Sequence, residues 1–180
     1  MKPFRNIIVN CCWIALLLFF AGCGAPQRYW PQEDIMGSET ARPVGSQVVL
    51  IASRSSDFKK LLVAKLHEQL AAVGLAQKTI GVEELAQVDA TDYAAVVVIN
   101  TCLAWGLDHD VQTFLDRQET DENIIILTTS GNGAWLPDKD GRGFDAISAA
   151  SKMTNVDTVA QDVMVSIHSQ LHKEKPNPTH

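Results

Sequence analysis

Three short stretches of small polar and aromatic residues have the composition of a site for a phosphorylated ligand that carries a flat ring. The stretch 53–56 combines hydroxyls, a guanidinium and the backbone amides at the start of a helix pattern, all of which can bind phosphate. The stretches 100–107 and 128–135 each contain a tryptophan, and two indoles can stack on a flat ring. The candidate binding residues are Ser53, Arg54, Ser55, Ser56, Thr101, Trp105, Gly106, Thr129, Gly131 and Trp135.

The chain around these stretches alternates between strand and helix patterns, and its three strongest apolar runs predict strands that are covered on both faces. The predicted strands are 48–51, 75–82, 94–99, 124–127 and 144–147, and the predicted helices are 58–73, 107–115 and 156–171. This order implies a three-layer α/β domain with right-handed crossovers. The three candidate stretches follow the strong strands, at the carboxyl ends where open parallel sheets bind ligands.

The stretch 53–58 resembles the flavodoxin phosphate loop, Ser/Thr-x-Ser/Thr-Gly-Asn-Thr. Ser53 and Ser55 match this motif, whereas Ser56, Asp57 and Phe58 replace its last three residues. Over residues 47–172 the chain resembles the flavodoxin-like family in the order of its elements and in these loops. The resemblance implies a flavodoxin-like sandwich with a five-stranded parallel sheet of order 2-1-3-4-5, the strands being numbered along the chain. It also implies FMN as cofactor and electron transfer with a redox partner protein.

Two departures from this family bear on the expected site. Only residues 131–143 separate the last two predicted strands, which leaves little room for the family's fourth helix and can leave the sheet open to a partner. Residues 145–151 resemble a motif on which exported flavoproteins carry FMN as a phosphoester, here on Ser151, with Ala149 in place of the motif's Gly. An ordinary strand followed by a turn explains the same residues.

The N-terminus has the layout of a secretory signal peptide: Lys2 and Arg5 precede an apolar run over 7–20. The run ends in Phe20-Ala21-Gly22-Cys23, which resembles a bacterial lipobox, although Phe20 replaces the usual Leu or Val. The resemblance implies that Cys23 is acylated, with chains such as palmitate, and anchors the protein to the membrane of the cell envelope. Because Gly24 rather than Asp follows, it implies the outer membrane, facing the periplasm, in a Gram-negative cell.

The predicted organisation is a signal peptide over 1–22, an acylated cysteine with a flexible tether over 23–46, a folded domain over 47–172 and a disordered tail over 173–180. The length of 180 residues fits one such domain, and a hydrophobic content of 46% excludes a disordered chain. The formal net charge of −6 becomes −8 once the signal peptide is removed, which argues against nucleic acid as a partner. No metal site is expected, since His168 and His172 lack a third ligand.

These residues leave three functions open. The first is an envelope-anchored flavodoxin-like protein that binds FMN and transfers electrons. The second is a flavin-free, lipid-tethered binding or assembly module of the same fold, which uses the same cleft or the uncovered sheet edge. Taken singly, the stretch 53–56 is also explained as a capped helix start, and the two tryptophans as cover for the sheet ends. The third is a flavin-dependent reductase. The sequence does not decide whether the protein is an enzyme.

Overall fold

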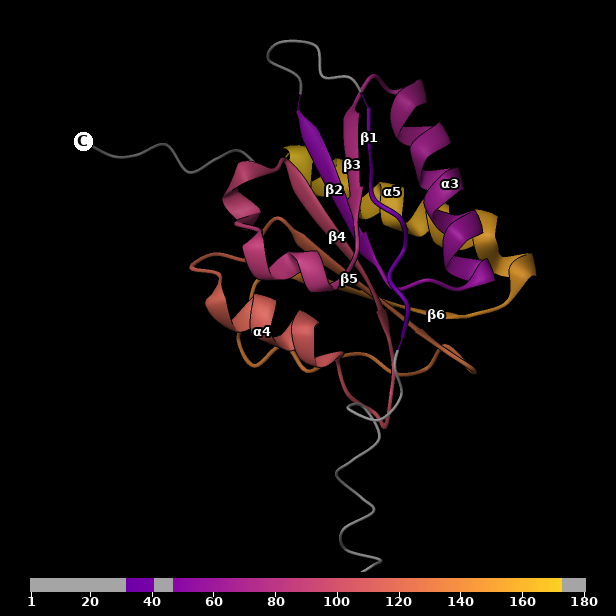
Figure 1. Ribbon diagram of the computed structural model, residues 1–180, viewed down its shortest axis with the longest axis vertical. Coiled ribbons are helices and arrows are strands. Elements are labelled where there is room, and N and C mark those ends of the chain that lie inside the picture. Colours follow the sequence, from indigo (N-terminus) through magenta and orange to yellow (C-terminus); the bar gives the residue numbers. More distant parts are fainter. Residues whose placement is uncertain (1–31, 41–46, 173–180) are drawn as a thin grey trace, which may run out of the picture. The chain divides into compact units, whose positions relative to one another are not determined.

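The computed structural model describes residues 32–40 and 47–172, which belong to one compact unit that begins at Gln32. The predicted signal peptide, Cys23 and the predicted tail over 173–180 lie outside the described residues. The described part is an α/β fold with a six-stranded, mostly parallel sheet and three α-helices (Figure 1). Within this part of the chain, no helix has the length and apolar content that a membrane span requires.

Five parallel strands form most of the sheet, in the order β3-β2-β4-β5-β6. They are β2 (Val48–Ser53), β3 (Ala76–Ile80), β4 (Ala95–Thr101), β5 (Ile124–Ser130) and β6 (Asp145–Ala150). A sixth strand, β1 (Ser38–Glu39), pairs antiparallel with the outer edge of β3. The α/β class is therefore confirmed, but the predicted count of five strands is wrong, and the order of the complete sheet differs by the addition of β1.

Helices cover both faces of the sheet because the central strands are apolar on both sides. On one face, α3 (Asp57–Ala72) packs against α5 (Val156–His172) and the sheet. On the other face lie α4 (His109–Arg117) and two short 3₁₀ helices, η1 (Glu83–Gln87) and η2 (Ala90–Asp92) (Figure 1). All three predicted helices are present, with their ends within two residues of the predicted positions.

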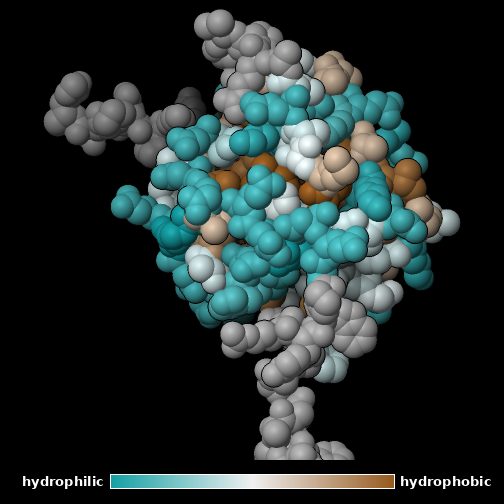
Figure 2. Space-filling view, viewed as in Figure 1, coloured by the Kyte–Doolittle hydropathy of each residue, from teal (hydrophilic) through white to brown (hydrophobic). Residues whose placement is uncertain are grey.

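The connection between β5 and β6 contains no helix among the described residues, in agreement with its short length. Most of the described surface in this view is hydrophilic, and hydrophobic residues show between polar ones across the upper middle and at the right-hand edge (Figure 2). Most apolar side chains are thus buried in the two layers of core on either face of the sheet.

The segment 32–40 packs against the domain, although the sequence analysis assigns it to the tether. The amide of Ile35 donates a hydrogen bond to the Ser53 carbonyl at 3.2 Å, and the amide of Thr40 donates to the Gln77 carbonyl at 3.1 Å. The folded unit therefore begins at least fifteen residues before the predicted boundary at Gln47. Polar composition alone does not reveal this segment, because backbone hydrogen bonds and single side-chain contacts with distant residues hold it in place, and it has no hydrophobic stripe of its own.

Candidate functional site

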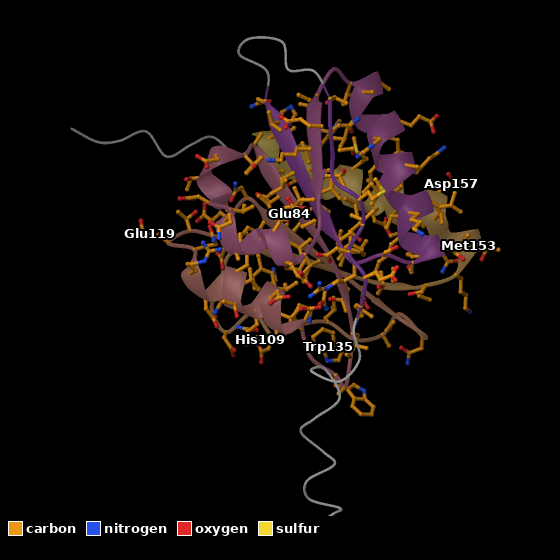
Figure 3. The ribbon with its side chains drawn as sticks, viewed as in Figure 1. Glu84, His109, Glu119, Trp135, Met153 and Asp157 are labelled. Atoms are coloured by element: carbon orange, nitrogen blue, oxygen red, sulfur yellow. The ribbon has the colours of Figure 1, made fainter. Side chains whose placement is uncertain are left out.

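The three candidate loops meet at one end of the sheet because β2, β4 and β5 are adjacent and parallel. We call the surface formed by residues 53–57, 101–108 and 130–136 the carboxyl edge. The amide of Cys102 donates to the Thr129 carbonyl at 2.9 Å and so joins two of these loops. His109 and Trp135 lie at the lower end of the view in Figure 3, where β4 ends. The structure thus brings together the three loops that the sequence analysis expects at one end of the sheet.

Arg54, a predicted phosphate ligand, is instead buried at the centre of four carboxylates. Its guanidinium nitrogens lie 2.9 Å from Asp34, 3.3 Å from Glu83, 3.0 Å from Asp108 and 2.6 Å from Asp110. Burial by itself lowers the pKa of Arg54. The carboxylates outweigh this effect and raise the pKa: Asp108 acts through its hydrogen bond and its charge, Asp34 through its charge, and Asp110 through its hydrogen bond. The guanidinium is therefore fully used inside the protein.

The segment 33–35 lies across the predicted phosphate loop. The amide of Ser55 donates to the Glu33 carbonyl at 2.6 Å, while the amide of Ile35 donates to the Ser53 carbonyl. A backbone amide that phosphate would need is thus already bonded to a carbonyl oxygen of the same chain. This contact also brings two acidic residues, Glu33 and Asp34, to the loop, and the negative charge of their carboxylates opposes the binding of an anion.

Asp34 is held at this position by more than Arg54. Its Oδ2 accepts a hydrogen bond from the amide of Glu83 at 3.0 Å. A Cβ on Gly81 would lie 2.3 Å from the same oxygen, so the glycine at this position makes room for the carboxylate. The close fit indicates that the contact between the segment 33–35 and the domain is specific.

Two of the three serine hydroxyls of the loop also take part in hydrogen bonds within the chain. The Ser53 hydroxyl is fully buried and donates to the Arg54 carbonyl at 2.8 Å. Ser56 is the N-cap of α3, and its Oγ accepts from the Lys59 amide at 3.3 Å. Together with the paired guanidinium and the bonded Ser55 amide, these contacts mean that the residues present do not fit the phosphate of FMN in this geometry.

Lys59 is a candidate functional residue that the sequence analysis missed. Its side chain projects from the first turn of α3 and is only 3% exposed; its Nζ donates to Thr101 Oγ1 at 2.5 Å and to the Ile99 carbonyl at 3.3 Å. Thr101 in turn donates to Gln32 Oε1 at 2.9 Å. Burial lowers the pKa of Lys59 to about 8, although the charge of Asp108 opposes this shift.

A signal for Lys59 exists in the sequence. The residue lies four positions before Val63 and seven before Leu66, on the stripe of α3 that packs into the core. A lysine at a stripe position can be buried only if its ammonium finds partners. Those partners come from β4, forty or more residues away in the sequence, and spacing alone does not reveal them.

The loop after β4 presents Trp105 to solvent. The amide of Gly106 donates to the Leu103 carbonyl at 3.1 Å and closes a tight turn. Both central residues have positive φ, 51° at Ala104 and 56° at Trp105, which is the conformation that usually requires Asn or Gly. The Trp105 side chain is 82% exposed, so the turn holds a large aromatic ring in water at a conformational cost.

The loop after β5 is fixed against β6. The Ser148 hydroxyl lies within hydrogen-bond distance of the carbonyls of Gly133, at 2.8 Å, and Trp135, at 2.7 Å. A Cβ on Gly133 would lie 2.3 Å from the Ala150 nitrogen, and the φ of Gly133 is +69°. Close backbone contact therefore explains this glycine without a ligand.

The remaining predicted site residues of this loop differ in exposure. Thr129 is buried, and its Oγ1 donates to the Asn100 carbonyl at 3.0 Å. Gly131 is exposed and Trp135 is half-buried. Ser151 lies exposed directly after β6, where its amide donates to the Ser130 carbonyl at 3.0 Å. The two indoles thus share the carboxyl edge but present unequal surface to a ligand.

Comparison with known proteins gives no family for this chain. No family model matches it, and no curated protein matches its sequence. A solved structure of an oxidoreductase from Corynebacterium diphtheriae aligns with a TM-score of 0.47 and 12% identity, over 72% of this chain and 99% of that one. At these values we infer neither ancestry nor function from the similarity. Among the described residues, no group of three or more His, Cys, Asp or Glu side chains could hold a metal ion.

Proposed function

We propose that this protein is a flavin-free binding module of flavodoxin-like fold, held at the bacterial cell envelope by lipid on Cys23, which binds through its carboxyl edge. Two features support the fold: the parallel order β3-β2-β4-β5-β6, and the helices on both faces of the sheet. A single observation carries the functional part. At the carboxyl edge the polar groups bond to one another, while the Trp105 indole is left 82% exposed.

A large exposed indole favours a binding role on energetic grounds. Burying an aromatic side chain of this size removes roughly 150–250 Å² from water, and each Å² of apolar surface contributes about 25 cal/mol. A turn with two non-glycine residues at positive φ costs about 1–2 kcal/mol for each residue. A partner that covers Trp105 recovers hydrophobic free energy, whereas the isolated domain gains nothing from the strain.

The two flavin-dependent alternatives both need FMN at the loop 53–58. The Arg54 guanidinium, the Ser55 amide and the Ser53 hydroxyl are already bonded within the chain. Binding of FMN would require the segment 33–35 to leave together with Asp34, and it would then place a phosphate beside the three carboxylates that still share the guanidinium, those of Glu83, Asp108 and Asp110. This geometry favours the flavin-free module over an electron-transfer protein or a reductase.

The lipid anchor rests on the sequence of the N-terminus and is tested separately. Cells that produce the wild-type chain should yield a membrane-bound protein whose mass exceeds that of residues 23–180 by its acyl chains. The variant Cys23→Ala should lose this added mass and leave the membrane fraction. An unmodified wild-type protein, cleaved elsewhere or not at all, would refute the anchor.

The binding surface is tested by photo-crosslinking in cells. A benzophenone amino acid replaces Trp105 in one variant and Val165, an exposed residue on α5, in a matched control. We expect a discrete adduct from position 105 and none from position 165. Equal labelling at both positions, or none at position 105, would overturn the proposal that the carboxyl edge is the binding surface.

A further inference from the structure

The described chain begins at the carboxyl edge. Gln32 accepts a hydrogen bond from Thr101, which lies four residues before Trp105 on the same loop. Eight residues separate Gln32 from Cys23. Nine steps along an extended chain span at most about 30 Å. If Cys23 carries lipid, this length limits the distance between the bilayer surface and the carboxyl edge, whatever path those residues take.

Apolar side chains are exposed at this same edge. Trp105 and Leu136 lie in the segments that follow β4 and β5, and Met36 follows Ile35, which is bonded to the end of β2. β2, β4 and β5 are consecutive in the sheet, so the segments that carry these residues adjoin neighbouring strands, and the turn with Trp105 follows the middle one of the three. Tryptophan is enriched where membrane meets water, because its ring is apolar and its N–H can still donate a hydrogen bond.

We infer that the carboxyl edge docks on the bilayer that anchors the chain, with Trp105 entering the headgroup layer. This inference rests on the proposed function, since it names the partner of that surface and needs the lipid on Cys23. The tether raises the local concentration of bilayer around the edge, so a few apolar side chains suffice for docking. The strained turn at Ala104 and Trp105 then holds the indole toward the membrane before contact.

The negative charge of the protein determines which lipid composition the carboxyl edge can dock on. The chain without residues 1–22 carries a formal charge of −8, and the carboxyl edge holds several carboxylates around one guanidinium. An anionic membrane surface repels such a protein over about one Debye length. The partner is therefore a bilayer of zwitterionic lipid, and binding does not depend on a basic patch.

The test uses the lipidated full chain in vesicles of phosphatidylcholine and phosphatidylethanolamine, some with brominated acyl chains. The double variant Trp30→Phe, Trp135→Phe leaves Trp105 as the sole tryptophan after signal cleavage, and Trp30→Phe, Trp105→Phe leaves Trp135 as the matched control. We expect the emission of Trp105 to shift to the blue and to be largely quenched by the brominated acyl chains, whereas the emission of Trp135 should change little. The quenching of Trp105 should be weaker in vesicles enriched in phosphatidylglycerol. Quenching that grows with anionic lipid would contradict the inference.

The outcomes separate this inference from the proposed function. Protein that floats with the vesicles while Trp105 stays unquenched, with emission typical of water, overturns bilayer docking and leaves the lipid anchor intact. Protein that does not float at all refutes the anchor itself. If the tryptophan variants fail to fold, the benzophenone at position 105 supplies the same test: an adduct with phospholipid supports docking, and an adduct with protein overturns it.

Discussion

Replacement of Arg54 by Met tests whether the loop after β2 is a structural centre and not a ligand site. The guanidinium is paired with four carboxylates, two of which are largely withdrawn from water: the side chains of Asp108 and Asp34 are 11% and 23% exposed. Methionine fills a similar volume but leaves both carboxylates without a cation. Removing one partner of a buried ion pair costs about 3–5 kcal/mol, because the other charge stays in a poorly solvated place.

The exposed partners, Glu83 and Asp110, add little to this cost, since exposed pairs contribute about 0–1 kcal/mol each. We therefore expect Arg54→Met to lower the free energy of unfolding by about 3–5 kcal/mol. Adding Asp108→Asn should recover part of the loss, because it removes one of the two buried charges that Arg54→Met leaves unpaired.

Urea unfolding followed by circular dichroism measures the effect. With an m-value of about 2 kcal/mol/M, the transition midpoint should fall by roughly 2 M. Arg142→Met is a matched control, because its partner Asp116 is 53% exposed and the expected loss is below about 1 kcal/mol. An Arg54→Met protein within about 1 kcal/mol of wild type would refute the structural role of the guanidinium.

Three further substitutions test local features. Lys59→Met should stabilise the protein at pH 7 by up to about 3 kcal/mol. Burial lowers the pKa of Lys59 from 10.5 to about 8, so the wild-type protein loses stability as the pH falls through that interval and the buried amine becomes charged. Urea unfolding should show that the gain vanishes near pH 11, and a gain that persists there would contradict this cause. Ala104→Gly should raise the melting temperature by relieving about 1 kcal/mol of backbone strain, whereas Ala134→Gly, where φ is not positive, should lower it. Gly133→Ala should lower the free energy of unfolding by about 2 kcal/mol or more, since the added Cβ meets the Ala150 backbone. An unchanged melting curve would disprove this contact.

The fold is largely predictable because its core elements carry local signals. The runs that become β2, β4 and β5 are buried almost throughout, so their lack of polar alternation identifies them as central parallel strands. Asp108 caps α4 and Ser56 caps α3, and both residue types are preferred at helix N-caps. β1 has no comparable signal, since two polar residues pair only through their backbone.

The candidate site is less predictable because its contacts join distant parts of the chain. Sequence reasoning places the three loops together but cannot foresee that Asp34 and Asp110, 20 and 56 residues from Arg54, occupy its guanidinium. The burial of Lys59 is hidden from sequence reasoning for the same reason, because its partner Thr101 lies 42 residues away in the chain. Residue type suggests a phosphate ligand at such a loop, whereas the partners that the fold supplies determine whether those groups are free.

Titration with FMN of the protein that lacks residues 1–23 tests the central claim most directly. Tryptophan emission reports on both indoles of the carboxyl edge once Trp30 is replaced by Phe, and the visible spectrum reports flavin that copurifies. The flavin-free module predicts a colourless protein and no saturable quenching of its emission as FMN is added. A yellow protein, or saturable quenching at one FMN per chain, would contradict the account and restore an electron-transfer role.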